Sequence, residues 1–212
     1  MRVKPSEFDA GLLQFGEPEI FSNGGATIAL KYDGESGLEL KIPAGRVAFD
    51  CGFAKGSNTK LLMSIELMRT PEFQEVRGVL SAVDEASRKH LRDEADEICK
   101  DLKLKDADTI HTLRTGNNMG ALVKPAKDSK YPDQISMKWM EKDKIHIIDT
   151  ERNDVKWNSI GRGSTVEAFV NIKGIWVDKG NVTMQMDATG LKVKVCVKPK
   201  KRKLSLDDMF DD

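Results

Sequence analysis

The chain has 212 residues, of which 39% are hydrophobic and 32% are charged, as expected of a soluble globular protein of one domain or two small ones. No run approaches the about 18 apolar residues that a membrane span needs, and the first 25 residues lack the apolar run of a secretory signal. The 34 basic and 34 acidic residues balance, so the total charge does not mark a simple basic nucleic-acid binder.

The chain begins with a stretch that resists a regular assignment. Residues 1–22 mix aromatic and aliphatic residues with two prolines, which predicts an irregular N-terminal arm. Strict alternation then predicts strands around residues 26–32, 61–67, 135–139, 166–170, 182–186 and 191–197. Turn residues at Asp33-Gly34, at 178–181 and at Thr189-Gly190 favour hairpin joints. We therefore expect a mainly β fold, as a small antiparallel barrel or sandwich.

One long segment follows a helical pattern instead. Thr70-Pro71-Glu72 is typical of a helix start, with an N-cap, a proline in the first turn and an acid near the positive end. Apolar residues at helical spacing predict one or two helices through about residue 103, and the charged stretch 88–97 should be their solvated face. Residues 105–133, rich in turn formers, predict mainly loop around one or two short strands.

The cysteines and histidines argue against a metal site. Cys51, Cys99 and Cys196 are odd in number and far apart, which favours a reducing compartment over a disulfide framework. No CxxC pair is present, and the three histidines are equally dispersed. Because zinc needs ligands clustered at short spacing, we expect no metal, and nothing in the sequence indicates another cofactor.

Aromatic residues beside basic residues form the first candidate site. A protein that holds a single nucleic-acid strand needs a cationic groove for phosphates and flat side chains on which bases stack. The candidates are Lys138 beside Trp139, Lys156 beside Trp157, Lys173 before Trp176, and Arg46 with Phe49 and Phe53. Alternation favours a core position for Trp139, whereas the turns near Trp157 and Trp176 leave core and surface equally open.

A glycine-rich turn, Gly161-Arg162-Gly163-Ser164, is the second candidate. Such a turn can present backbone N–H groups to a phosphate, and Arg162 adds a positive charge. The P-loop ending is absent, and a plain turn leading into a strand explains the same residues. No HExxH, nucleophile-elbow or GxGxxG motif occurs, so we do not expect an enzyme; a nuclease would need clustered carboxylates.

The C-terminal residues form the third candidate. Residues 198–203 hold five basic side chains and residues 207–212 hold four acidic ones, a pattern that indicates an exposed, disordered interaction tail. Apolar residues stranded in such a segment often fold onto a partner. The predicted partner-binding residues are Leu206, Asp207, Asp208, Met209, Phe210, Asp211 and Asp212. A tail that merely solubilises the protein is the alternative.

These features resemble a known family. Residues 161–195, with a Gly-x-Gly-Ser turn, an alternating strand, Lys-Gly-Ile-Trp, a hairpin and a second strand, resemble the closing strands of the single-stranded DNA-binding protein of T-odd bacteriophages. Residues 30–67, with Leu-Lys-Ile-Pro at 40–43, resemble its relatives in large DNA viruses of eukaryotes. The acidic, aromatic C-terminus is the third shared feature.

The resemblance implies an OB-fold barrel over residues 1–197 with an inserted helical segment at about 71–103, followed by the tail 198–212. It implies sequence-independent binding of single-stranded DNA in replication, recombination or repair, and a homodimer. It also implies that the tail docks on replication proteins and competes with DNA for the basic groove, which electrostatics makes plausible. By position, Lys173 and Trp176 fall in the hairpin that the family places near DNA.

Two features of the tail depart from the family. Asp211 and Asp212 follow Phe210, where family tails end on the aromatic residue, and a basic run precedes the tail. That run resembles a nuclear import signal, formed by Lys198, Lys200, Lys201, Arg202 and Lys203. Lys203-x-x-Leu206-x-x-Met209-Phe210 also resembles a degenerate sliding-clamp box. The tail's partner is therefore a polymerase, a helicase-primase or a sliding clamp, in the nucleus or at a cytoplasmic viral replication site. A replication-accessory or scaffold protein is the alternative.

Overall fold

The structure is a computed structural model that describes residues 2–22, 24–126, 128, 130–142 and 145–196. The strands are β1 (Arg2–Val3), β2 (Leu13–Ile20), β3 (Ala26–Tyr32), β4 (Glu35–Ser36), β5 (Leu38–Arg46), β6 (Gly52–Phe53), β7 (Lys60–Glu66), β8 (Val123–Lys124), β9 (Gln134–Met140), β10 (His146–Asp149), β11 (Thr165–Asp178) and β12 (Asn181–Lys194). The helices are α1 (Pro71–Asp93), α2 (Ala95–Asp101) and α3 (Ala107–Thr115), and short 3-10 turns occur at η1 (Pro5–Glu7), η2 (Ala10–Leu12) and η3 (Trp157–Ser159). The predicted tail, residues 198–212, lies outside the described residues.

Five strands close into a barrel in the order β5–β7–β9–β12–β11 and back to β5. Directly after β5, Val47 pairs with Ile65 of β7, and the Ala48 N–H donates to the Ser64 carbonyl at 3.0 Å. On the other side, β9 runs parallel to β12, with Lys138 opposite Asp187. Counted along the chain, the strands neighbour one another as 1-2-3-5-4-1, which is the OB-fold order. The prediction of a mainly β, OB-fold-like barrel is confirmed.

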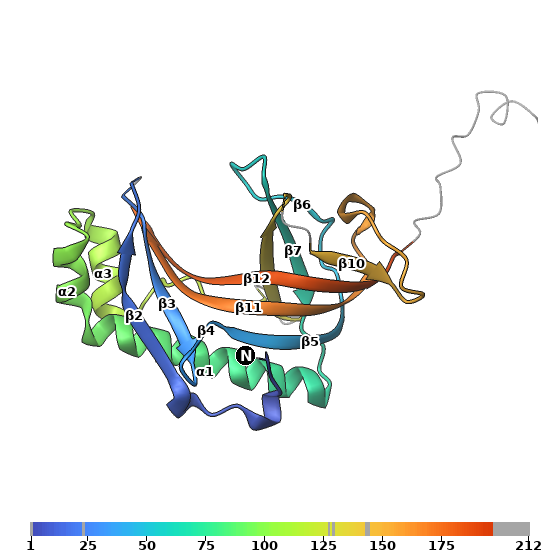
Figure 1. Ribbon diagram of the computed structural model, residues 1–212, viewed down its shortest axis with the longest axis horizontal. Coiled ribbons are helices and arrows are strands. Elements are labelled where there is room, and N and C mark those ends of the chain that lie inside the picture. The colour runs from blue at the N-terminus through green and yellow to red at the C-terminus, as the bar shows by residue number, and fades with distance from the viewer. Residues whose placement is uncertain (1, 23, 127, 129, 143–144, 197–212) are drawn as a thin grey trace, which may run out of the picture.

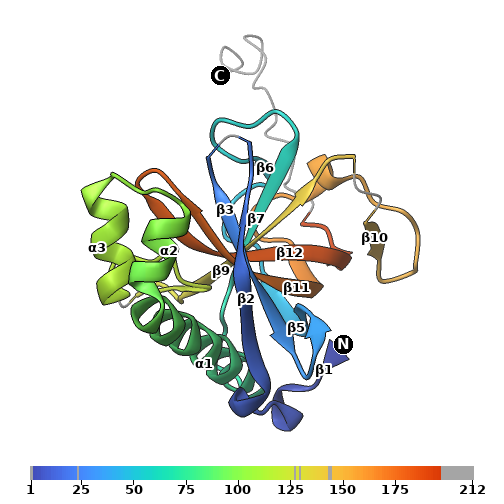
Figure 2. The ribbon, with the colours of Figure 1, turned by 60° about the vertical axis from the view of Figure 1, so that its left-hand side comes forward.

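The helices are inserted between β7 and β9 and lie together on one side of the molecule (Figure 2). The helical segment predicted through about residue 103 is confirmed as α1 and α2. The loop predicted for residues 105–133 is partly wrong, because α3 forms there. Asp106 caps α3 by accepting the Thr109 N–H at 2.7 Å, and Gly116 ends it with a φ of 69°. So short a helix offers too few apolar repeats for a periodicity to be recognised.

The N-terminal segment is more regular than the sequence predicts. Residues 13–20 form β2, an antiparallel partner of β3, where the sequence predicts an irregular segment. Pro18 sits at a register shift on this strand, and edge strands and bulges are where a sheet tolerates proline. Pro18 therefore marks an edge strand and not the absence of a strand.

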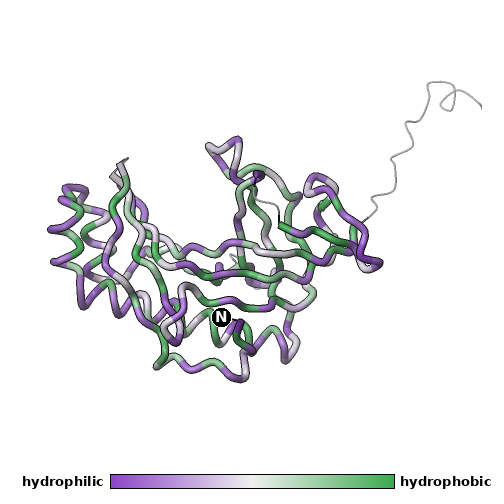
Figure 3. Tube along the Cα trace, viewed as in Figure 1, coloured by the Kyte–Doolittle hydropathy of each residue, from purple (hydrophilic) through white to green (hydrophobic). Residues whose placement is uncertain are grey.

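The two longest strands, β11 and β12, form a bowed ribbon that runs through the whole molecule (Figure 1). Hydrophilic and hydrophobic residues alternate along it (Figure 3). Residues 165–172 of β11 pair with β5, whereas residues 174–177 pair with β3. The predicted joint at Thr189-Gly190 is wrong: Gly190 pairs with Phe169 and Ala188 with Val170, so Thr189 is the extra residue of a bulge inside β12.

Two hydrophobic cores divide the molecule. The first fills the barrel and is sealed on one side by α1, through residues such as Phe73, Val76 and Leu80. The second lies between the helices and a four-stranded sheet, which we call the arm: β2, β3 and the neighbouring ends of β11 and β12 (residues 174–178 and 181–185). Within the described part of the chain, no helix is long and apolar enough to cross a membrane.

Candidate nucleic-acid interface

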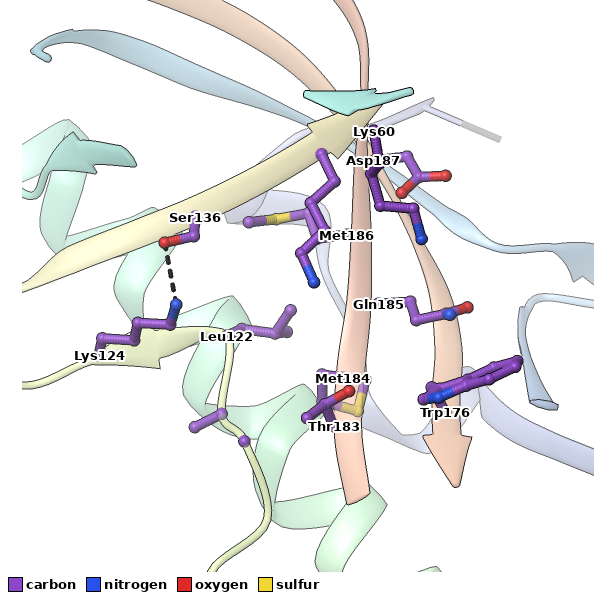
Figure 4. Close-up of a pocket in the computed structure, with 13 residues that line it drawn as sticks. Lys60, Leu122, Lys124, Ser136, Trp176, Thr183, Met184, Gln185, Met186 and Asp187 are labelled. Atoms are coloured by element: carbon purple, nitrogen blue, oxygen red, sulfur yellow. Dashed lines mark hydrogen bonds between the residues drawn. The ribbon is translucent and has the colours of Figure 1, made fainter. Parts of the chain in front are cut away.

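A groove of about 270 Å³ opens between the arm and the outer face of β7 and β9 (Figure 4). Its lining residues are Lys60, Gly120, Ala121, Leu122, Lys124, Ser136, Lys138, Trp176, Thr183, Met184, Gln185, Met186 and Asp187. Basic side chains come from the barrel strands β7 and β9 and from β8 beside them, and the large aromatic side chain comes from the arm. We refer to this feature as the groove.

The groove exists because β9 and β12 diverge on either side of the Lys138–Asp187 pair. Residues 120–124 fill the gap between them. The Gly120 N–H donates to the Val182 carbonyl at 2.8 Å, and the Gly120 carbonyl accepts from the Met184 N–H at 2.9 Å. A Cβ at Gly120 would lie 2.7 Å from Cγ2 of Thr183, so this close approach to β12 requires glycine.

Residues 120–124 form one wall of the groove, and a buried carboxylate holds this wall in place. Asp84 of α1 is 3% exposed, and its two oxygens accept the Leu122 N–H at 3.0 and 3.1 Å. Burial raises the pKa of Asp84 to about 6, although the backbone hydrogen bonds and the nearby Arg88 act in the opposite direction. The wall of the groove is thus attached to the longest helix by a charge-assisted hydrogen bond.

Three lysines converge at the barrel side of the groove. Burial of the Lys138 stem lowers the pKa of that side chain, and the charges of Lys60 and Lys124 lower it further, whereas Asp187 raises it. The Lys124 ammonium donates to the Ser136 hydroxyl at 3.1 Å. Such a group of cations is stabilised when an anion enters, because a phosphate reduces their mutual repulsion.

Aromatic residues form two groups, one at the arm end of the groove and one outside the residues that line it. At the arm, the partly exposed Trp176 contacts Phe21 with ring centroids 5.6 Å apart. In the second group, Phe53 meets Trp157 edge-on at 5.4 Å, and both Phe53 (45%) and Phe49 (61%) are exposed. A second hollow of about 350 Å³ lies beside this pair. Its lining residues include Trp139, His146, Lys156 and Trp157.

The predicted site residues thus fall into two groups. Lys138 and Trp176 share the groove, and Lys173 lies beside it, where its ammonium pairs with Asp187 at 2.6 Å. The other candidates gather around the loop after β5 and the segment before β11: Arg46, Phe49, Phe53, Lys156, Trp157 and Arg162. The expectation of a core position for Trp139 is confirmed, since it is 4% exposed.

The glycine-rich turn does not present its backbone to solvent as a phosphate cradle would. The Arg162 N–H donates to the Asp50 carboxylate at 2.6 Å, and the Gly163 N–H donates to the Val47 carbonyl at 2.9 Å. The plain turn leading into a strand is therefore the correct interpretation of residues 161–164. The side chain of Arg162 remains exposed.

Sequence reasoning missed Lys60, Lys124 and Phe21. The two lysines have no aromatic neighbour in the sequence, and Phe21 lies in the segment that was expected to be irregular. Alternation in β7 does offer a signal, because burial of Leu61 and Met63 places Lys60 on the outer face. Within the described ranges, no three His, Cys, Asp or Glu side chains are grouped closely enough to hold a metal ion.

No known family profile and no curated protein matches the chain. Among solved structures, the single-stranded DNA-binding protein from bacteriophage Enc34 in complex with single-stranded DNA is 11% identical, with a TM-score of 0.47 over 86% of this chain and 97% of that chain. A C-terminal truncation of the Enc34 protein is 13% identical, with a TM-score of 0.45 over 90% and 99%. The single-stranded DNA-binding protein gp2.5 of bacteriophage T7 is 10% identical, with a TM-score of 0.47 over 82% and 93%. At such values, the OB-fold assignment rests on the strand order described above.

Proposed function

We propose that this protein binds single-stranded DNA without reading its sequence, in DNA replication, recombination or repair. The observation that carries the proposal is the convergence of Lys60, Lys124 and Lys138 in one groove with Trp176. The groove lies on the face of the second and third barrel strands and extends toward the hairpin between the fourth and fifth, where OB-folds bind oligonucleotides.

The two kinds of side chain have different tasks in this proposal. The lysines neutralise phosphates, which supplies most of the affinity and makes binding depend steeply on salt. Trp176 stacks on a base, and because every base has a flat face, stacking tolerates any sequence. The role is therefore that of a binding protein and not of an enzyme.

We extend the proposed path of the strand from the groove toward the second aromatic group. Phe53 and Trp157 offer a further stacking surface, with Phe49 exposed nearby. Basic side chains beside that surface are available for phosphates: Arg46, Lys156 and Arg162. Lys173 contributes less, because its ammonium is already paired with Asp187.

Titration of the full-length protein with a labelled oligonucleotide tests the proposal. We expect tighter binding to a single strand than to a duplex of equal length, and an affinity that falls steeply with salt. Replacing Lys138 with Ala should weaken binding to all sequences alike and lower the salt slope by about one. Lys100, which is exposed on α2, provides the matched control for removing a surface lysine. Equal affinity for both forms of DNA, or none for either, would contradict the proposal.

The tail adds a second part to the proposal. We propose that Leu206, Met209, Phe210 and the acidic residues around them dock on a replication protein and compete with DNA, and that the protein forms a homodimer. The sliding-clamp-like spacing from Lys203 to Phe210 favours the alternative of a replication-accessory protein. Removing residues 204–212 separates the two, because competition predicts stronger DNA binding, whereas the accessory role predicts loss of clamp binding with little DNA binding by the body.

A further inference from the structure

The hairpin of β2 and β3 stands outside the barrel, yet it places an aromatic ring at the end of the groove. Across the arm, Glu19 pairs with Thr27, Thr27 with Trp176, and Trp176 with Thr183. Side chains at paired positions point to the same face of a sheet, and Phe21 follows Glu19 by two residues. Phe21 therefore lies on the same face as Trp176, and the two rings are in contact at 5.6 Å.

Packing in the core does not explain this aromatic pair. The opposite face of the arm carries the buried Ile28, Ile175 and Val177, which pack against the helices. Phe21 belongs to neither core and is 39% exposed. An aromatic pair left partly in water beside a cationic groove indicates a surface that a ligand covers.

We propose that Phe21 and Trp176 form one composite stacking platform for a base at the outer end of the groove. This inference rests on the proposed function and adds a contact from outside the barrel. The ligand is a nucleobase of the bound single strand, whose neighbouring phosphates lie toward Lys60, Lys124 and Lys138. Phe21 thus becomes a DNA-binding residue, although it lies more than 150 residues from Trp176 in the sequence.

The ring geometry indicates where the base lies. The two rings are tilted by 31° and already touch, so a base between them would have to separate them to about 7 Å, two stacking distances. A base that lies over the open side of the pair needs no such opening. Phe21 enlarges the apolar surface under the base and keeps the indole from swinging away, and both effects favour stacking.

The variant Phe21→Ala tests the platform in the full-length protein, with the label on the oligonucleotide. We expect about tenfold weaker binding with an unchanged salt slope, because one stacking contact is lost and no phosphate contact is. Phe21→Tyr should bind as tightly as the wild type, whereas Phe21→Leu, which keeps an apolar side chain in the hairpin, should bind like the alanine variant. Ile20→Ala is the matched control, and we expect no loss from this more exposed neighbour.

An oligonucleotide that lacks its bases distinguishes stacking from a structural role. On this ligand at low salt, the wild type and Phe21→Ala should bind equally, because no base is present to stack. A loss that persists on the abasic ligand would show that Phe21 only supports the fold and would overturn the platform. If the wild type binds normal single strands and Phe21→Ala binds them equally well, the platform is wrong while the proposed function stands. If the wild type binds no single strand, both fail.

Discussion

The barrel and the arm share the strands β11 and β12 but differ in what covers them. In the barrel, the two strands close a ring with β5, β7 and β9, and the inner face is filled by core residues. In the arm, the helices cover one face, and the other face remains open with Trp176 on it. A closed barrel offers a ligand only its outer surface, where lysine side chains can stay in water. The uncovered face of an open sheet can also offer aromatic side chains for stacking. The groove combines lysines with an aromatic side chain because it lies at the junction of the barrel and the arm.

The largest effect on stability should come from a substitution that separates β3 of the arm from β11. Gly174 has a φ of 144°, and a Cβ there would lie 2.0 Å from the Ile28 carbonyl oxygen. Gly174→Ala should lower the free energy of unfolding by about 4 kcal/mol, because β3 can no longer approach β11. Urea unfolding measures the loss. Gly78→Ala on the exposed face of α1, where nothing lies within 4 Å, is the control and should stabilise by about 0.5–1 kcal/mol. Equal behaviour of the two variants would show that the contact of the arm with β11 is not tight.

The same contrast explains what the sequence could predict. The barrel strands follow a strict alternation, as in β7 and β9, so their residues and their buried face were predictable. The arm was not, because β2 is an edge strand with Pro18 and a register shift, and its burial is incomplete. The groove was predictable only in part. Lys60, Lys124 and Lys138 come together through strand pairing between distant segments, and no local pattern contains that register.

Asp84 connects the groove wall to helix α1 and should make stability depend on pH. Its pKa is raised to about 6 by burial, above the ordinary value for aspartate in an unfolded chain. The folded state therefore holds this proton more tightly, and this group's contribution to stability is present at low pH and lost as pH rises from about 4 to above 6. We expect a loss of about 2–3 kcal/mol over that window.

The variant Asp84→Asn isolates that contribution, because it keeps one acceptor for the Leu122 N–H and cannot titrate. The difference in unfolding free energy between the wild type and the variant should shift in favour of the variant as pH rises. Partly exposed carboxylates with lowered pKa values, such as those of Asp106 and Asp149, have the opposite dependence but are common to both proteins. A difference that stays constant from pH 4 to 7 would mean that Asp84 is not desolvated in the folded protein.

The smallest effect concerns Asp187, whose negative charge among the residues that line the groove opposes the proposed ligand. Asp187 lines the groove opposite Lys138 and also pairs with Lys173 at 2.6 Å. Asp187→Asn removes a negative charge from the path of the phosphates and frees Lys173, so single-stranded DNA should bind about threefold more tightly at low salt. The gain should shrink as salt increases, because both charges are partly exposed, and stability should change by less than about 0.5 kcal/mol. Weaker binding by this variant would instead indicate that Asp187 holds Lys138 or Lys173 in place for DNA. In that case the carboxylate belongs to the binding surface, and the barrel contributes polar positioning beside the stacking surface of the arm.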